Sequence, residues 1–228
     1  MSDNDDSIVV NEFTEASAKD FRKKVFKRAS TDPNMPITVY IDSYGGYVDA
    51  LNSMLATMRQ VPNQFVTVCA GKAMSCGAVL LAAGDFRFID EGSRAMIHQS
   101  SSGAFGPTES LQNAVNENKR LNKQLMDFIL KRCGKNMTQF KAAIKKSLHG
   151  DDDARNLYLD AKEALEFGLV DFIGMPLIKP VVMYTVELAP QKQYESVENF
   201  EIQEEKQSKK KKTTKKKSKK KQTRNKSK

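Results

Sequence analysis

The order of hydrophobic patterns along the chain predicts an α/β fold of stacked β-α-β units with parallel strands. Short runs of β-branched residues alternate with segments in which apolar residues recur every three or four positions. The connections between them are short and rich in Gly, Pro, Asn and Asp, which are typical turn residues. A helical crossover returns the chain to the same end of a sheet, so successive strands are expected to be parallel. With 39% hydrophobic residues among 228, the chain can bury a substantial core.

The N-terminal part of the chain contains the first strands and helices of this pattern. Residues 7–10 predict a strand, and Thr14 is the expected N-cap of an amphipathic helix over 15–28. Alternating β-formers predict a second strand over 37–42. Apolar residues at helical spacing then predict a helix over 47–60. Each strand is thus followed by a helix, as a parallel arrangement requires.

The middle of the chain carries the most hydrophobic segments. An apolar, β-branched run predicts a buried strand over 65–70. The Ala/Leu-rich stretch after it predicts a helix over 75–83 that ends at Gly84. Short apolar runs predict two further strands over 86–89 and 94–98. Because the helix is apolar on all sides, we expect it to be buried.

A long amphipathic helix is expected in the second half of the chain. Thr108 is its expected N-cap, and the helix runs to about Arg132. Its apolar stripe consists of Leu111, Val115, Leu121, Leu125, Phe128 and Ile129. A shorter helix is expected over 137–148. Packing within one chain is the simplest explanation of such a stripe, but a projecting helix must bury it on another subunit.

The last elements are marked by a capping box and short apolar runs. Asp160 and Glu163 have the spacing of a capping box that opens a helix. A strand is expected over 168–171, and a final strand or arm over 176–187.

These patterns divide the chain into three parts. We expect a disordered acidic N-terminus over 1–7, one α/β domain over 8–190, and a disordered lysine-rich tail over 191–228. Residues 206–228 hold fourteen lysines and arginines and no acidic residue, so without them the net charge of +9 becomes −5. The tail could contact nucleic acid or an acidic partner, although it has no aromatic residue that could stack on bases, and non-specific charge is the favoured interpretation.

The composition also limits where the chain could act. No apolar run approaches the roughly 20 residues of a membrane span, and the acidic N-terminus does not resemble a secretory signal. The cysteines are Cys69, Cys76 and Cys133, an odd number without metal-binding spacing. Free thiols are typical of the reducing cytoplasm, which is the expected location.

One hydroxyl lies at the predicted junction between the strand over 65–70 and the helix over 75–83. Ser75 stands among small residues in the segment from Gly71 to Gly77. A sharp turn of this kind exposes a serine oxygen, and the N–H groups of the first helical turn have no helical partner and can hold an oxyanion. Taken alone, the segment more often means a helix cap.

Two further segments change that interpretation. Ser43 to Val48 form a Gly-Gly turn after a strand, and Met96 to Gln99 form a strand end with a histidine. These segments, with Met74 to Gly84, resemble in the same order three motifs of the proteolytic subunits of the ATP-dependent Clp protease. That family has a Ser-Pro-Gly-Gly-x-Val turn, a nucleophile segment and a Met-Ile-His-Gln strand. The resemblance covers about residues 37–173 and implies the crotonase-like Clp-protease fold with a protruding helical handle.

The resemblance implies a serine peptidase that forms an acyl-enzyme. Ser75 corresponds to the nucleophile and His98 to the general base, since an imidazole titrates near neutrality. The N–H of Gly45 or Gly46 and the N–H of Cys76 would form the oxyanion hole. The other histidine, His149, lies beside a glycine in a polar stretch and is expected at the surface.

The third catalytic position departs from the family pattern. Where the family has an aspartate, the segment from Arg155 to Asp160 has Asn156. An amide oxygen can accept from the histidine N–H, but it supplies no negative charge to an imidazolium. An acid from Asp151 to Asp153 could serve instead, although a solvated acidic loop is the more ordinary role for these residues. The sequence therefore predicts a weak or conditionally active peptidase.

The resemblance also implies an assembly. The long helix would be the handle that pairs two stacked rings of identical subunits, which hydrolyse polypeptides in an enclosed chamber. An AAA+ unfoldase would be the partner that uses ATP, and no cofactor or metal is expected in this chain. The 36 residues before the first motif strand are fewer than in the family pattern, which weakens the expectation of unfoldase docking.

Two other functions remain as alternatives. The first is a catalytically impaired ring subunit, which Asn156 favours and the Ser75 and His98 pair disfavours. The second is a crotonase-type acyl-CoA enzyme, because that superfamily shares the core and a backbone oxyanion hole. Such enzymes typically use carboxylates, so the serine and histidine pair disfavours this second alternative.

Overall fold

The computed structural model describes residues 8–99, 105–146 and 156–179. The chain divides into two compact units, Met1–Ile178 and Lys179–Lys228, and all helices and strands named below belong to the first. The expected disordered segments over 1–7 and 191–228 lie outside the described residues, and so does the expected domain boundary at residue 190.

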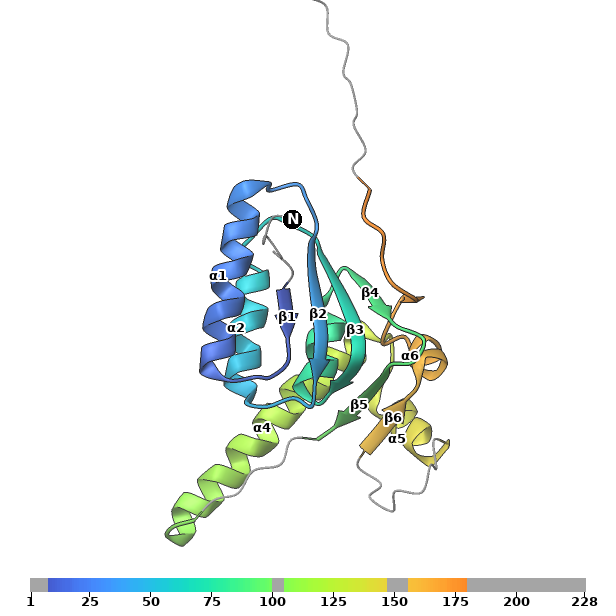
Figure 1. The fold of residues 1–228 in the computed structure, drawn as a ribbon. Coiled ribbons are helices and arrows are strands. Elements are labelled where there is room, and N and C mark those ends of the chain that lie inside the picture. The colour runs from blue at the N-terminus through green and yellow to red at the C-terminus, as the bar shows by residue number, and fades with distance from the viewer. Residues whose placement is uncertain (1–7, 100–104, 147–155, 180–228) are drawn as a thin grey trace, which may run out of the picture. The chain divides into compact units, whose positions relative to one another are not determined.

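A seven-stranded sheet forms the centre of the first unit (Figure 1). The strand order is β1-β2-β3-β4-β7, and β5 leaves this path to pair with both β3 and β6. The strands are β1 (Ile8–Val10), β2 (Ile37–Ser43), β3 (Phe65–Met74), β4 (Phe86–Ile89), β5 (Arg94–His98), β6 (Asn156–Leu159) and β7 (Phe172–Ile173). All neighbouring pairs are parallel except β5 and β6, which are antiparallel. The predicted α/β fold is confirmed, but the sequence analysis predicted no strand over 156–159, and this strand, β6, runs antiparallel to β5.

Strand β3 is longer than expected because it pairs with two different strands along its length. Residues 66–69 pair with β4, whereas residues 72–74 pair with β5. On its other edge β3 pairs with β2, with a register shift before Ser43. The expected end at residue 70 is therefore wrong, since the Gly-Lys segment continues the ladder to Met74. As a result, the end of β3 lies beside the start of β5.

Six helices accompany the sheet in the described ranges. They are α1 (Glu15–Thr31), α2 (Val48–Met58), α3 (Cys76–Ala83), α4 (Thr108–Arg132), α5 (Met137–Lys146) and α6 (Ala161–Phe167). Helices α1 and α2 pack side by side next to β1 and β2 (Figure 1). None of the described helices has the length and hydrophobicity of a membrane-spanning segment.

Two helix starts confirm the capping predictions. The Thr14 hydroxyl accepts from the Ser17 N–H at 3.2 Å, and the Ser17 hydroxyl accepts from the Thr14 N–H at 2.9 Å. At α6, Asp160 and Glu163 exchange the equivalent bonds at 2.8 and 3.0 Å. Each cap satisfies backbone donors that the helix leaves unpaired.

Helix α3 is buried on all sides, as its composition predicts. Seven of its eight residues, from Cys76 to Ala82, are buried. Its C-terminal carbonyls are bonded to side chains. The Thr67 hydroxyl donates to Leu81 O at 2.7 Å, and the Arg132 guanidinium donates to Ala82 O at 2.7 Å and also to Gly84 O. These bonds tie the helix that follows Ser75 to both β3 and α4.

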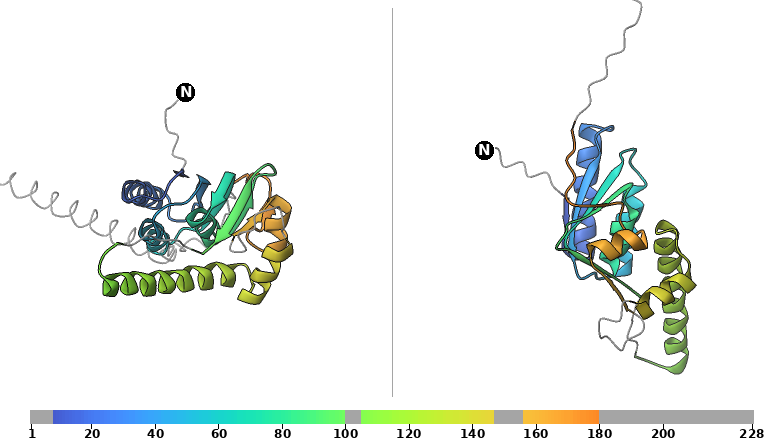
Figure 2. Two further views of the ribbon diagram at one scale, coloured as in Figure 1. Left: turned by 90° about the horizontal axis from the view of Figure 1, so that it is seen from below. Right: turned by 90° about the vertical axis from the view of Figure 1, so that its right-hand side faces the viewer.

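Helix α4 differs along its length. Thr108 is its first residue and not its cap, because Pro107 occupies the cap position and makes no side-chain bond. In the predicted stripe, Leu111 and Val115 are exposed, whereas Ile129 is buried and Phe128 is half-buried. Figures 1 and 2 show the N-terminal end of α4 extending beyond the sheet. Among the residues that the structure describes, only the C-terminal half of the stripe is therefore covered.

The segment after α6 forms no strand until Phe172. Gly168 adopts a left-handed conformation with φ of 83°, and the Leu169 N–H bonds back to Ala164 O at 2.9 Å. These bonds close the helix and keep residues 168–171 out of the sheet, so the strand expected there is wrong. Residues 176–179 form no strand either. Residues 147–148 of the expected helix and 180–187 of the expected arm lie outside the described residues.

Candidate active site

Ser75 occupies a strained turn between β3 and α3. Its φ of 55° and ψ of −118° make it the one non-glycine residue with positive φ among those described. Its N–H donates to Met96 O at 2.9 Å, which ties the turn to β5. A conformation of this kind costs on the order of 1–3 kcal/mol and is typical of functional positions. It also matches the sharp strand-to-helix turn that presents a nucleophilic serine.

The imidazole of His98 lies against the Ser75 hydroxyl. His98 Nε2 is 2.8 Å from Ser75 Oγ. The pairing of β3 with β5 produces this contact. Met74 lies opposite Met96, and Ser75 and His98 follow these residues within two positions. Both side chains are half-buried, so they are held by the fold while open to solvent on one side.

The Gly-Gly turn after β2 passes directly against the start of α3. A Cβ at Gly45 would lie 2.8 Å from Ser75 Cβ and 3.3 Å from Cys76 N. The Gly45 N–H donates to Ser43 Oγ at 3.0 Å, so this amide is already used. Among the described residues, no backbone hydrogen-bond acceptor is paired with the N–H of Gly46 or the N–H of Cys76, and the Cys76 backbone interacts with the thiol of the same residue. These two amides are therefore the candidate donors beside the serine.

Asn156 begins β6 directly opposite His98. The two residues are partners in the antiparallel register of β5 and β6. Side chains of directly opposed residues project from the same face of a sheet, so the amide lies on the imidazole side. The other candidates for this position, Asp151 to Asp153, lie outside the described residues, and so does His149.

A cleft of about 330 Å³ adjoins the reacting pair. Its walls come from the start of α2, from α3, from the end of β5 and from the C-terminal half of α4. Its lining residues are Gly46, Tyr47, Val48, Asp49, Ser75, Cys76, Val79, Ile97, His98, Asn118, Leu121, Leu125, Met126 and Ile129. Most of them are apolar, so the cleft suits an apolar group held next to the hydroxyl.

The sequence is similar to that of known proteins. The family model described as Clp protease matches residues 3–176. ATP-dependent Clp protease proteolytic subunit 4 of Streptomyces avermitilis is 35% identical over 162 residues, which cover 70% of this chain and 68% of the relative. Subunit 1 of Corynebacterium glutamicum is 34% identical over 160 residues, 69% of this chain and 73% of the relative. The chain belongs to the Clp protease family.

The thiols of this Clp protease family member are poor nucleophiles. Burial raises the pKa of Cys69 to about 12 and that of Cys133 to about 11. Burial also raises the pKa of Cys76, whose Sγ donates to Gly46 O at 3.3 Å. Burial thus disfavours the reactive thiolate, and the Ser75 hydroxyl, which lies against His98 Nε2, is the better candidate. The described residues contain no cluster of three metal-ligating side chains.

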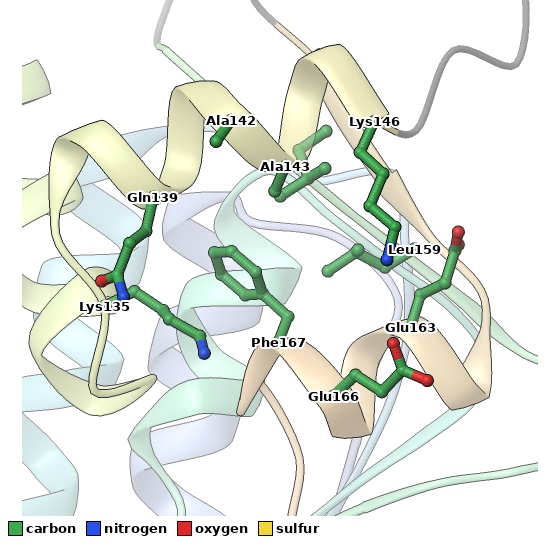
Figure 3. Close-up of a pocket in the computed structure, with 10 residues that line it drawn as sticks. Lys135, Gln139, Ala142, Ala143, Lys146, Leu159, Glu163, Glu166 and Phe167 are labelled. Atoms are coloured by element: carbon green, nitrogen blue, oxygen red, sulfur yellow. The ribbon is translucent and has the colours of Figure 1, made fainter.

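A second pocket of about 280 Å³ lies away from the reacting pair, between α5, α6 and β6. Figure 3 shows Lys135, Lys146 and Phe167 projecting into it. Leu157 and Leu159 line it, and because side chains alternate along a strand, Asn156 lies on the opposite face of β6. No serine, cysteine or histidine is among the described residues that line this pocket.

Sequence reasoning missed the residues that shape the cleft. The apolar stripe of α4 indicated a surface for assembly, but Leu121, Leu125 and Ile129 from that stripe line the cleft beside Ser75. Tyr47 and Asp49 also line it, although the sequence analysis considered only the glycines before them. Helical spacing reveals that a stripe exists, but it does not reveal what covers each part.

Proposed function

We propose that the chain is a serine endopeptidase that hydrolyses unfolded polypeptides or peptides through an acyl-enzyme. The observation that carries this proposal is the 2.8 Å approach of His98 Nε2 to Ser75 Oγ at a strained turn. A hydroxyl, a base and free backbone donors in one place are the components of acyl transfer. Family membership also favours peptide hydrolysis over acyl-CoA chemistry.

The reaction follows from the positions of these groups. The Ser75 hydroxyl donates its proton to His98 Nε2 as its oxygen attacks the scissile carbonyl carbon. The oxyanion that forms accepts from the N–H groups of Gly46 and Cys76. His98 then gives the proton to the leaving amine, and the C–N bond breaks to leave an ester on Ser75. Water repeats the sequence, with His98 as base, and releases the acid.

The cleft would hold the side chain that precedes the scissile bond. Its lining by Val48, Val79 and Leu125 favours apolar side chains, because their burial removes apolar surface from water. The proximity of the cleft to Ser75 would place the next carbonyl over the hydroxyl.

Asn156 would orient the imidazole without charging it. Its amide oxygen can accept from the second ring N–H of His98 and so hold the ring toward Ser75. It cannot stabilise the imidazolium as a carboxylate does, and an Asp-to-Asn change at this position of a serine protease costs about 10⁴ in kcat. We therefore propose a slow peptidase. The same residue favours the alternative of a catalytically impaired subunit that lends its fold to active partners.

We propose further that the chain works as a homo-oligomer of stacked rings. The exposed side chains of Leu111 and Val115 support this, because the half of the α4 stripe that contains them is covered by nothing in the described part of the chain. Both relatives are named as proteolytic subunits of an ATP-dependent Clp protease. By analogy, an AAA+ unfoldase would deliver polypeptides and consume the ATP.

Covalent labelling tests the peptidase proposal. A fluorophosphonate reacts with a serine only where a base and oxyanion donors activate it, so we expect labelling at Ser75 in the wild-type chain. Labelling should be lost in Ser75→Ala and weakened in His98→Ala, as peptide mapping by mass spectrometry would show. Native mass spectrometry of the same samples would report whether each variant keeps its assembly. An unlabelled wild-type protein that is folded and assembled would instead support the impaired subunit.

A further inference from the structure

The cleft beside Ser75 has a polar rim at the start of α2. Tyr47 and Asp49 line the cleft together with Val48, which lies between them in the chain. Both rim side chains are exposed, and Tyr47 keeps 72% of its surface accessible. The rim therefore combines an aromatic ring and a carboxylate at the open side of a largely apolar cleft.

The carboxylate of Asp49 is available to a ligand. No ion pair or side-chain hydrogen bond to it is recorded within the described ranges. No lysine or arginine is among the described residues that line the cleft, and Asp49 is the one carboxylate there; the other ionisable side chains are those of Tyr47, Cys76 and His98. Within the described lining, the rim thus carries a negative charge and no lysine or arginine to balance it.

Helix stability alone does not explain this rim. An acid in the first turn of a helix interacts favourably with the helix dipole, and Glu15 has that position in α1 as Asp49 has in α2. Glu15 is not among the residues that line the cleft, whereas Asp49 is. A large aromatic side chain that is mostly exposed, as Tyr47 is, adds little to the core.

A long cationic side chain fits this combination of surfaces. The methylene stem of lysine or arginine packs on apolar walls while its charged head stays at the wet edge. At that edge the head would meet a carboxylate and the face of an aromatic ring, both of which attract cations. Glutamate or aspartate would be repelled by Asp49.

We infer that Tyr47 and Asp49 make the cleft accept lysine or arginine before the scissile bond, in addition to apolar residues. The inference rests on the proposed peptidase function and specifies its substrate class. Asp49 acts here as a specificity-determining residue that contacts the substrate side chain and takes no part in proton transfer.

Two matched peptide substrates test the inference. They differ only before the scissile bond, where one has lysine and the other norleucine, which is lysine without its ammonium group. The measured quantity is the ratio of kcat/KM for the lysine peptide to kcat/KM for the norleucine peptide. We expect Asp49→Asn to lower this ratio on the order of tenfold and Tyr47→Leu to lower it on the order of threefold.

Glu15→Gln is the matched control. It removes an acidic residue from the first turn of a helix but leaves the cleft unchanged, so it should keep the wild-type ratio. Circular dichroism and native mass would confirm that each variant is folded and assembled. High salt should reduce the wild-type ratio and leave that of Asp49→Asn nearly constant, because salt screens the attraction between charges.

The outcomes separate the inference from the peptidase proposal. If the wild type cleaves the norleucine peptide and all three variants share its ratio, the inference is wrong and the peptidase proposal stands. If the folded wild type cleaves neither peptide and is not labelled at Ser75 by fluorophosphonate, the peptidase proposal fails and the inference fails with it. If the protein is labelled but turnover is too slow to measure, peptidyl phosphonates with the same two side chains give the ratio as labelling rates.

Discussion

The two sides of the reacting centre are constrained very differently. On the serine side, β3 pairs with β2 and β5, the Ser75 N–H is bonded to Met96 O, and Gly45 fits against the Ser75 Cβ position. On the histidine side, His98 ends β5 and Asn156 begins β6, so the pair stands at the end of its ladder. The position of the hydroxyl is thus fixed from several directions, whereas the base stands at a strand end with the uncharged Asn156 as its partner in the β5–β6 register.

This difference separates the positioning of the nucleophile from the stabilisation of the charged base. The serine side has the strained turn and, beside it, the backbone amides of Gly46 and Cys76 that we propose as oxyanion donors. The histidine side keeps the contact between base and nucleophile but has an amide where a carboxylate would stabilise the imidazolium. The rate of peptide cleavage is therefore expected to be limited by proton transfer and not by the placement of the nucleophile. A charge added on the histidine side should raise the reaction rate, whereas a disturbance of the serine side should lower it.

The largest effect is expected from Asn156→Asp, which restores a charge on the histidine side. A carboxylate opposite His98 would stabilise the imidazolium in the transition state, so kcat/KM for a peptide amide should rise by about 10³ to 10⁴. Asn136→Asp, on the exposed start of α5, is the control and should change nothing. An unchanged or lower rate in Asn156→Asp would remove the argument that this amide limits the enzyme.

The next largest effect is expected from Gly45→Ala, which disturbs the serine side. The new methyl group would lie 2.8 Å from Ser75 Cβ, and the φ of 106° is one that L side chains rarely adopt. We expect fluorophosphonate labelling of Ser75 to slow by roughly 10²-fold and the free energy of unfolding to fall by about 1–3 kcal/mol.

Gly134→Ala is the matched control for Gly45→Ala. Gly134 has a φ of 64°, but a Cβ there would meet nothing within 4 Å. Urea denaturation should therefore show some loss of stability, while labelling of Ser75 keeps its wild-type rate. Equal labelling rates in both variants would mean that the close approach of Gly45 does not position the serine.

The smallest effect is expected from Asp171→Asn, which touches neither side. Arg87 donates three hydrogen bonds to the Asp171 carboxylate, from its backbone N–H to Oδ2 at 2.9 Å, from Nε to Oδ2 at 3.0 Å and from NH2 to Oδ1 at 2.5 Å, and so joins β4 to the start of β7. We expect the variant to unfold more easily by about 1 kcal/mol at neutral pH with unchanged labelling of Ser75. Asp127→Asn, which removes an exposed pair with Lys123, is the control and should cost less.

The same variant has a predictable dependence on pH. Burial tends to raise the pKa of Asp171, but the hydrogen bonds and charge of Arg87 outweigh it and leave the pKa below its usual value. A lowered pKa in the folded state stabilises the fold above the unfolded pKa, and this stabilisation is lost as the pH falls through the folded pKa. The difference in unfolding free energy between wild type and variant should therefore shrink in acid, which denaturation curves at several pH values would show.

The sequence predicted those parts of the fold that depend on nearby residues. The caps at Thr14 and Asp160, the burial of α3 and the strand-to-helix turn at Ser75 each follow from patterns within a few positions. The extension of β3 to Met74 and the reversed direction of β6 were not predictable in this way. They depend on pairing between segments far apart in the chain, which no local pattern encodes.

The same distinction between local patterns and long-range contacts applies to the candidate site. Ser75 and His98 were proposed from motifs, and the geometry places them in contact. The contribution of α4 to the cleft and the rim formed by Tyr47 and Asp49 became visible only in three dimensions. A helical stripe looks the same in sequence whether it covers a core, a cleft or another subunit.

The left-handed backbone at Ser75 has one last consequence. Glycine would adopt this conformation without strain, so a chain selected only to fold would have little use for a side chain at that position. A hydroxyl there opposes stability and can be justified only by what its oxygen does. A subunit with only a structural role would gain nothing from keeping a strained serine at this position. The strain at Ser75 is thus an argument for the proposed catalytic role.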